Sequence, residues 1–384
     1  MTINNDNVVE LLKNILEKAT SFHASDVHIE PFKSLLRIRL RVDGTLIEIL
    51  NLKKNISENL ISRIKVISGL DISECRLPQD GNFVFKNNIN VRVSILNTVY
   101  GEKAVLRIIY SDERFLDKNN LGFFENDLKA IEKVFKSTHG AIIITGPTSS
   151  GKTTTLNSFI KNINDIDKNI FTIEDPVENF IFGVNQVDIN PKINFDFSDA
   201  LRAILRQDPD IIMIGEIRDL KTAEIVVRAS ITGHLVLATM HTNDSISAIN
   251  RLIDMGINKF MIAAGVNIII SQRLVRRLCD NCKKKIKINK TDSQFLNINQ
   301  ESFIYEAVGC DKCRQIGYTG RFVIYEYFIF DDDIRSMFNN ENYIDRIKKY
   351  LELKKMSKLI DNGIKNLLLG KTSVEEIKKN IIFY

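Results

Sequence analysis

The sequence has 384 residues, of which 44% are hydrophobic, and its 53 basic and 48 acidic side chains give a formal net charge of +5. That length allows two or three packed domains, and the charge excess is too small to indicate nucleic-acid binding by itself. The longest apolar run, Phe260 to Ile270, is shorter than the roughly 20 residues that span a bilayer, and the N-terminus lacks the basic start and apolar core of a secretory signal. Five cysteines, four of them in two Cys-x-x-Cys pairs, favour a metal site in a reducing compartment over disulfides.

Residues 1–110 are predicted to form a small α+β domain. Apolar residues at helical spacing predict an opening amphipathic helix. From Leu36 to Val42 apolar residues alternate with arginines, and Asp43-Gly44 predicts a tight hairpin turn after that strand. A helix near residues 56–68 follows, and three further alternating segments predict strands: "NFVF", "NVRVSILNTV" and "KAVLRIIY".

A polar linker, residues 111–124, precedes a change of pattern. Over residues 125–278 short apolar runs alternate with helical segments, and the runs "AIIIT", "NIFTI", "DIIMI" and "HLVLAT" are typical of parallel strands. We therefore expect an α/β domain, a parallel sheet with helices on both faces. Residues 279–320 hold the cysteine pairs around a lysine-rich insert. Residues 321–384 are predicted to be helical, with Ser373 and Glu376 forming a capping box.

The strongest motif is "GPTSSGKTTT", which follows the run "AIIIT" and precedes a predicted helix, as a phosphate-binding P-loop requires. Its glycines let the backbone curl so that N–H groups point at phosphate oxygens, and the helix start adds partial positive charge. Lys152 is expected to reach the β- and γ-phosphates, and Thr153 to offer its hydroxyl to Mg²⁺. The candidate nucleotide-binding residues are Gly146, Pro147, Thr148, Ser149, Ser150, Gly151, Lys152, Thr153 and Thr154.

A P-loop needs an acidic residue at the end of a neighbouring strand, and "DIIMIGE" supplies Glu216 there. The strand ends in Gly215 without the usual acid. We therefore expect Glu216 either to hold a water of the Mg²⁺ ion or to polarise the attacking water. Arg218 and Asp219 are either a structural ion pair or part of the catalytic machinery.

Two further strand ends carry ionisable groups. "TIEDPVE" places Glu174, Asp175 and Glu178 just past a predicted strand, where open α/β sheets bind ligands, so these acids are candidates for positioning Mg²⁺ or water. "TGHLVLATMHTND" has His234 and His241 on either side of a third strand. This pair is a candidate sensor of the γ-phosphate, although an isolated histidine is more often structural.

The two cysteine pairs, Cys279 with Cys282 and Cys310 with Cys313, are separated by 27 residues. Four thiolates suit a tetrahedral structural Zn²⁺ site without an open position. "NKTD", which starts at Asn289, matches a guanine-reading motif, but it lies in a lysine- and asparagine-rich stretch where chance matches are common, and no DxxG motif accompanies it. We therefore expect ATP rather than GTP.

The P-loop, "TIEDPVE", "LRQDPDIIMIGEIRD" and "TGHLVLATMHTND" together resemble the secretion ATPases of type II secretion systems and type IV pili. "SDVHIEP", "RLPQDGNF" and "VRVSILNTVYGEKAVLRI" in the first domain, and "QRLVRRLC" and "GYTGR" beside the cysteine pairs, extend the resemblance over about residues 20–384. The cysteine pairs are typical of the assembly ATPases rather than the retraction ATPases. The resemblance implies a RecA-like P-loop ATPase core, a smaller N-terminal α+β domain, a tetracysteine zinc insert and a helical C-terminus.

The resemblance also implies a function and a setting. Such enzymes are homohexamers at the cytoplasmic face of the inner membrane, where ATP hydrolysis drives a platform protein that assembles pilin subunits. The implied cofactors are ATP, Mg²⁺ and Zn²⁺, and the implied partners are further copies of the chain, the platform protein and a membrane-anchored recruiting protein. An acidic lipid surface is a further candidate, and no specific nucleic acid is expected. Many members carry an extra N-terminal domain for recruitment, whereas this sequence starts almost directly at the first core domain, so we expect recruitment through the opening helix or by a different route.

The family's motifs imply residue roles as well. Glu178 matches an acid that assists the metal or water, with Glu174 and Asp175 nearby, and His234 and His241 match the histidine box. Arg92 and Arg107, on predicted strands, match arginines that reach the phosphates within the ring, although the pattern alone also fits a solvated strand face.

Two alternatives remain open. The basic insert, residues 283–287, would suit a RecA-like motor that translocates or takes up DNA, but no aromatic and basic strip for stacking single strands accompanies it. A scaffold without catalysis is disfavoured because Lys152, Thr153 and Glu216 are all present.

Overall fold

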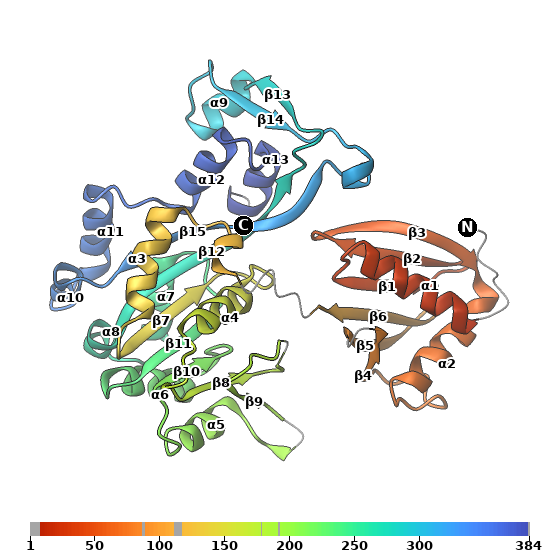
Figure 1. Cartoon of the computed structure of the whole chain (residues 1–384), viewed down its shortest axis with the longest axis horizontal. Helices are drawn as coiled ribbons and strands as arrows, with labels where there is room; N and C mark the ends of the chain where they lie inside the picture. The colour runs from red at the N-terminus through yellow and green to blue at the C-terminus, as the bar shows by residue number, and fades with distance from the viewer. Residues whose placement is uncertain (1–7, 87–88, 111–116, 178, 191–192, 383–384) are drawn as a thin grey trace. The chain divides into compact units, whose positions relative to one another are not determined.

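The computed structural model describes residues 8–86, 89–110, 117–177, 179–190 and 193–382. The chain divides into two compact units, Met1–Ser111 and Asp112–Tyr384 (Figure 1). Among the helices of the described residues, none combines the length and the apolar character needed to cross a membrane.

The smaller unit is a six-stranded antiparallel sheet packed against two helices (Figure 1). Its elements are α1 (Val8–Ser21), β1 (Asp26–Pro31), β2 (Leu35–Val42), β3 (Thr45–Lys53), α2 (Ser57–Ile67), β4 (Gln79–Phe85), β5 (Ile89–Thr98) and β6 (Gly101–Ile109). The strand order is β3-β2-β1-β6-β5-β4. Asp43 and Gly44 take φ values of +46° and +83° between β2 and β3, so the predicted hairpin turn is present. Alternate strand residues such as Val27 and Leu106 are buried, because only one face of the sheet packs into the core.

The larger unit is built around a seven-stranded sheet. The elements of this sheet and its helices are α3 (Glu125–Phe135), β7 (Gly140–Thr145), α4 (Lys152–Ile163), β8 (Ile170–Glu174), β9 (Asn185–Asp188), α5 (Phe197–Ile204), β10 (Ile211–Ile214), α6 (Leu220–Ile231), β11 (Leu235–Met240), α7 (Ser245–Asp254), α8 (Lys259–Gly265), β12 (Val266–Leu278), β15 (Tyr318–Ile329), α10 (Asp332–Met337) and α11 (Tyr343–Leu353). The order is β15-β12-β7-β11-β10-β8-β9, and all neighbours are parallel except β12 and β15.

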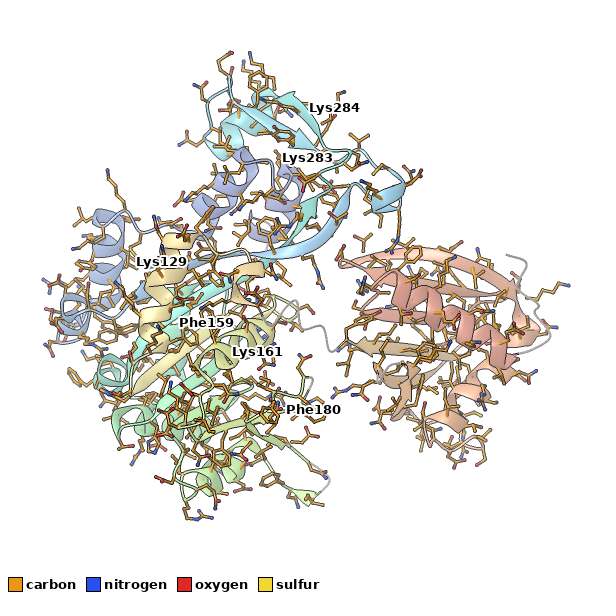
Figure 2. All side chains as sticks on the ribbon, viewed as in Figure 1. Lys129, Phe159, Lys161, Phe180, Lys283 and Lys284 are labelled. Carbon is orange, nitrogen blue, oxygen red and sulfur yellow. The ribbon has the colours of Figure 1, made fainter. Side chains whose placement is uncertain are left out.

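Both faces of this sheet are covered, which confirms the expected α/β class. Ala141 and Ile143 of β7 belong to the core beneath α5, α6, α7, α8, α10 and α11. Ile142 and Ile144 point the other way, into the core shared with α3 and α4. There the rings of Phe135 and Phe159 stack with centroids 4.0 Å apart, and Figure 2 shows Phe159 on α4. Burying one such ring contributes about 2–3 kcal/mol, which helps to fix α4 on the sheet.

A third, smaller core lies where the end of β12 pairs with the start of β15, and we call this region the cysteine subdomain. It comprises those strand ends, the hairpin of β13 (Lys284–Lys287) and β14 (Phe303–Glu306), α9 (Lys290–Leu296), α12 (Leu359–Leu368) and α13 (Val374–Ile377). Val275, Ile304, Leu367 and Ile377 are among its buried residues. Figure 2 shows Lys283 and Lys284 at its surface.

The C-terminal region differs in part from the sequence prediction. The expected helical region from residue 321 begins with a strand, because β15 continues to Ile329 against β12, and helices follow it. Ser373 Oγ accepts the Glu376 N–H at 3.3 Å, as predicted for a helix cap. The Glu376 carboxylate does not complete a capping box, since it accepts from Arg276 Nε at 2.8 Å instead.

Candidate active site

The P-loop joins β7 to α4, and its backbone has the strained geometry that the motif predicts. Gly146, Ser149 and Gly151 all have positive φ, at +151°, +63° and +84°. A Cβ on Gly146 would lie 2.4 Å from the carbonyl oxygen of Gln272, so only glycine fits this position. The loop therefore curls tightly into the start of α4, and the predicted nucleotide-binding residues from Gly146 to Thr154 lie together at the carboxyl end of β7.

Lys152 is turned back onto this loop. Its side chain is 7% exposed, and Nζ donates to the carbonyl oxygens of Gly146 at 2.8 Å and Pro147 at 3.0 Å. Burial lowers the pKa of Lys152 to about 8, an effect that the nearby Glu216 carboxylate opposes and the Arg273 guanidinium reinforces. The ammonium group is therefore buried in the loop with hydrogen bonds to neutral carbonyl oxygens, which is a poor environment for a cation even with the Glu216 carboxylate nearby. A phosphate group would be a better one.

Glu216 lies at the carboxyl end of β10, beside the P-loop. Its side chain is 17% exposed, and Oε2 lies 3.1 Å from Nε2 of His241. Its other oxygen accepts from Arg218 Nε. Because β10 and β7 flank β11 in a parallel sheet, Glu216, His241 and the P-loop share one edge of the sheet. Both carboxylate oxygens are thus oriented by a neighbouring side chain.

Arg218 and Asp219 do not pair with each other. Arg218 Nη2 reaches Asp175 Oδ2 at 3.4 Å, so Arg218 bridges Glu216 and Asp175. Asp219 Oδ1 accepts the Thr222 N–H at 2.9 Å and caps α6. Of the two interpretations that the sequence left open for this pair, the helix cap makes Asp219 structural, while Arg218 belongs to the site.

The three acids of "TIEDPVE" have different environments. Glu174 is 2% exposed, and one carboxylate oxygen accepts from Thr172 Oγ1 at 2.8 Å and from Gln186 Nε2 at 3.1 Å. The bond from Gln186 joins β9 to β8. Asp175 joins the site through Arg218. Glu178 lies outside the described residues.

The two histidines lie at opposite ends of β11. His241 follows this strand and contacts Glu216, whereas His234 precedes it and its carbonyl oxygen accepts the N–H of Gly140, the first residue of β7, at 3.1 Å. β11 has six residues, so at about 3.3 Å per residue roughly 20 Å separate the two side chains. Within one chain the structure therefore brings only His241 to the P-loop, because residues on either side of a strand lie at its two ends.

Sequence reasoning missed two residues of β12 that support the P-loop. Gln272 Nε2 donates to the Ser150 carbonyl at 2.8 Å, and the 5% exposed Arg273 donates through Nη2 to the Asn243 carbonyl at 2.7 Å. Thr145 Oγ1 accepts the N–H of Thr242 at 3.0 Å. These bonds fasten both the P-loop and the loop after β11. The sequence did carry a signal for these supporting residues: in "SQRLVRR" polar side chains directly follow an apolar run.

Arg92 and Arg107 lie in the smaller unit. They face each other across β5 and β6 and alternate with buried residues, so both belong to the face of the sheet away from the core. Arg107 is 66% exposed and its Nε lies 3.0 Å from Asp26 Oδ1. Two cations side by side on an accessible face are available to a partner of negative charge.

The four cysteines meet in the cysteine subdomain and form no disulfide. The Sγ atoms of Cys279 and Cys310 are 3.9 Å apart, and those of Cys282 and Cys313 are 3.7 Å apart. A tetrahedron with Zn–S bonds of about 2.3 Å has S–S edges of about 3.8 Å, so the spacing fits zinc. The backbone N–H of Gly317 donates to Cys313 Sγ at 3.2 Å.

"NKTD" has a structural role. Asn289 Oδ1 accepts the Asp292 N–H at 2.8 Å and caps α9, and the Asp292 carboxylate pairs with Lys378. The stretch that matches a guanine-reading motif therefore serves as a helix cap in the cysteine subdomain.

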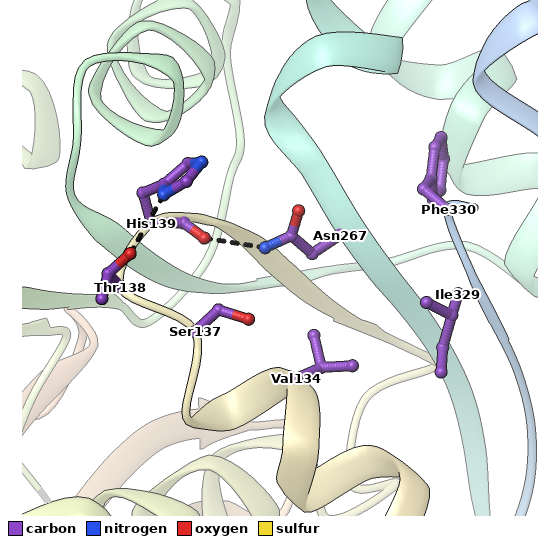
Figure 3. Close-up of a pocket in the computed structure, with 7 residues that line it drawn as sticks. All are labelled: Val134, Ser137, Thr138, His139, Asn267, Ile329 and Phe330. Carbon is purple, nitrogen blue, oxygen red and sulfur yellow. Dashed lines mark hydrogen bonds between the residues drawn. The ribbon is translucent and has the colours of Figure 1, made fainter. Parts of the chain in front are cut away.

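A pocket of about 380 Å³ lies at the amino edge of the sheet (Figure 3). Its lining residues are Val134, Ser137, Thr138, His139, Asn267, Ile329 and Phe330. The Asn267 amide donates to the His139 carbonyl at 2.7 Å and crosses the start of β7 (Figure 3). The P-loop follows the other end of β7, so this pocket is separate from the candidate active site.

Comparisons with known proteins agree with this arrangement. The family model for "Type II/IV secretion system protein" matches residues 2–379. The chain is 42% identical over 375 residues to the type II secretion system protein E of Pseudomonas aeruginosa, covering 96% of this chain and 74% of that protein. It is 41% identical over 391 residues to the type IV pilus assembly ATPase PilB of Myxococcus xanthus, covering 97% of this chain and 68% of that protein.

Among solved structures, the pilus retraction motor PilT with bound ADP superposes with a TM-score of 0.66 and 25% identity, over 95% of each chain. Three findings lead to one conclusion: a P-loop with Glu216 at the same edge of the sheet, two relatives above 40% identity, and a family model that spans nearly all residues. The chain belongs to the type II/IV secretion system protein family, and it is an ATPase of that family.

Proposed function

We propose that this chain is the motor that hydrolyses ATP to power pilus or pseudopilus assembly in a type II secretion or type IV pilus system. Relatives named for both kinds of machine support this proposal. The observation that carries it is the convergence of Lys152 and Glu216 at the carboxyl edge of a parallel sheet, next to a curled P-loop.

In this proposal the triphosphate of ATP lies in the P-loop. Lys152 leaves the carbonyl oxygens of Gly146 and Pro147 and bonds the β- and γ-phosphates, while the backbone N–H groups at the start of α4 bond their remaining oxygens. Thr153 and Glu216 would hold Mg²⁺ directly or through water, and such an ion would supply positive charge beside the phosphates. Glu216, oriented by His241 and Arg218, polarises the attacking water.

Further residues act around this centre. Asp175 holds Arg218 in place, and Glu178 assists the metal or the water. Arg92 and Arg107 supply cations to the phosphates of a neighbouring copy within a homohexamer, where developing charge on the transferred group needs stabilisation from outside the P-loop. His234 has no role at the P-loop of its own chain in this proposal. We assign it instead to a contact with a neighbouring copy in the ring.

We propose Zn²⁺ as the resident ion of the four cysteines, because the thiol spacing matches its tetrahedral geometry. The ion would fix the chain between Cys279 and Cys313. All four positions would be taken by protein ligands, so this site is structural.

The setting follows from the same family. We propose that the motor works in the cytoplasm at the inner membrane, on a platform protein, with a membrane-anchored recruiting protein and acidic lipids as further contacts. DNA translocation is not favoured, since the relatives reported above are named for secretion or pilus assembly. Stimulation of ATP hydrolysis by DNA, without stimulation by the platform protein, would contradict this choice.

Two substitutions test the site. Lys152→Ala should abolish nucleotide binding and turnover. Glu216→Gln should keep nucleotide binding, because the P-loop and Lys152 remain, and should lower kcat by about 10²- to 10³-fold, because the transition state loses its base. Phosphate release and calorimetric titration with ATP measure the two effects.

Glu224→Gln is the matched control for Glu216→Gln, because Glu224 lies on α6 in an exposed pair with Arg228 at 3.0 Å and should leave turnover unchanged. Wild-type phosphate release by either site variant would refute the proposed function.

A further inference from the structure

Glu326 of β15 touches the starts of two helices. Its Oε1 accepts from the backbone N–H of Ser245 at 2.9 Å and from Ser245 Oγ at 2.7 Å. Its Oε2 accepts the backbone N–H of Leu359 at 3.1 Å. Ser245 begins α7 and Leu359 begins α12, so one carboxylate serves both helices.

The position of this carboxylate matters because α7 starts just past the active site. Only residues 242–244 separate Ser245 from His241, whose Nε2 lies 3.1 Å from Glu216. The same short loop is held from the other side by Thr145 and Arg273, which bond Thr242 and Asn243. Glu326 therefore provides the anchor at the end of the loop where α7 begins.

A carboxylate is suited to this place for a physical reason. The first N–H groups of a helix have no partner within the helix, and the helix dipole adds partial positive charge there. Ser245 is 5% exposed and Leu359 is 8% exposed, so each N–H would be left largely without water if Glu326 did not accept from it. A neutral side chain with a single acceptor oxygen can serve only one of the two helix starts.

The other contact ties the loop to the cysteine subdomain. Leu359 and Leu367 of α12 lie in the buried core of that subdomain, with Val275 and Ile304. The Glu326 carboxylate is thus shared between the loop that carries His241 and a helix of the subdomain.

We infer that Glu326 is a positioning residue for ATP hydrolysis. It fixes the start of α7, and through the loop of residues 241–244 it holds His241 against Glu216. This inference rests on the proposed function, because it gives Glu326 a role in the same reaction. Glu326 does not touch the P-loop residues that bind the nucleotide, so its effect should appear in kcat and not in KM.

The test compares three variants of the full chain by steady-state ATP hydrolysis. Glu326→Gln should lower kcat about tenfold with KM for ATP within about twofold of wild type, since a small displacement of a catalytic contact costs rate without costing nucleotide binding. Ser245→Ala removes one of the three hydrogen bonds and keeps the backbone N–H, so it should lower kcat about threefold. This milder variant decides the question if Glu326→Gln does not fold.

Glu376→Gln is the matched control. Glu376 also joins a strand to a helix of the cysteine subdomain, through Arg276, but has no contact with the loop after β11. It should lower the melting temperature and keep kcat at temperatures where the variant is folded. Equal kcat loss in Glu326→Gln and Glu376→Gln at matched folded fraction, or wild-type kcat in Glu326→Gln, would overturn the inference.

Hydrogen exchange separates this inference from the proposed function. Residues 242–247 should exchange faster in Glu326→Gln than in Glu376→Gln. If the wild-type chain hydrolyses no ATP, the proposed function fails, and equal exchange of this segment in the two variants would then refute the positioning role on its own.

Discussion

At the scale of single residues, Lys152 shows how the P-loop is suited to a phosphate ligand. The ammonium group is buried against the carbonyl oxygens of Gly146 and Pro147, and this burial lowers its pKa to about 8. A triphosphate would stabilise the charged form and raise the pKa again. Protonation of Lys152 and nucleotide binding are therefore linked.

This linkage predicts the pH dependence of nucleotide affinity. Below about pH 7.5 Lys152 is charged with or without ligand, so the Kd for ATP should be constant. Above pH 8 the free protein loses the proton that the complex keeps, so binding takes up a proton and the Kd should rise by up to about tenfold per pH unit. Calorimetric titrations from pH 7 to 9.5 measure this change. A constant Kd across that range would show that Lys152 keeps its ordinary pKa.

At the scale of elements, the proposed zinc centre would stabilise the cysteine subdomain beside its hydrophobic core. Replacing Cys279 or Cys310 by serine should remove the bound zinc and lower the melting temperature of the subdomain, because metal binding contributes directly to the folding free energy of such small cores. A metal assay with thermal denaturation checks both effects.

Cys75→Ser is the control for these variants, since Cys75 is an exposed free thiol in the smaller unit. It should keep zinc and stability unchanged. A purified wild-type chain that holds no zinc after expression with the metal would end the zinc proposal.

The elements also show what the sequence could and could not predict. The four strands with uninterrupted apolar runs were expected, and so was the P-loop, because these signals are local. The pairing of β12 with β15 joins segments about 50 residues apart, and polar residues such as Gln272 and Arg273 interrupt its apolar pattern. Their bonds to Ser150 and Asn243 arise only when β12 lies next to β7. The sequence motif groups His234 with His241, but the two residues lie before and after β11. A strand carries its two flanking residues to opposite ends, so only His241 reaches the edge of the sheet with the P-loop.

At the scale of the whole molecule, the proposed ring makes the site depend on two copies. Arg92 and Arg107 lie on an accessible face of the smaller unit, whereas Glu216 and the P-loop belong to the larger unit. In the proposed hexamer a complete site would combine an arginine face from one copy with a P-loop from the next. Neither isolated unit should then hydrolyse ATP at the full rate.

Substitution of these arginines tests this dependence. Arg92→Ala or Arg107→Ala should lower kcat by about 10²- to 10³-fold and keep ATP affinity, because the lost cation acts on the transition state. Lys86→Ala removes a cation of the same unit that is paired with Glu17 at 2.5 Å, and it should have no effect. Mixing Arg107→Ala with Lys152→Ala copies should restore activity above that of either variant alone. A mixture without such recovery would mean that the arginine does not act between copies.

β12 and β15 run from the sheet of the ATPase core into the cysteine subdomain, and they stay paired apart from one register shift between Arg276 and Leu278. Thirteen residues of β12 extend about 40 Å at the usual rise of a strand. The pairing of β12 with β15 couples the nucleotide end of this ribbon to the cysteine end. A tilt of β12 at the P-loop would therefore be carried along the paired strands to the four cysteines.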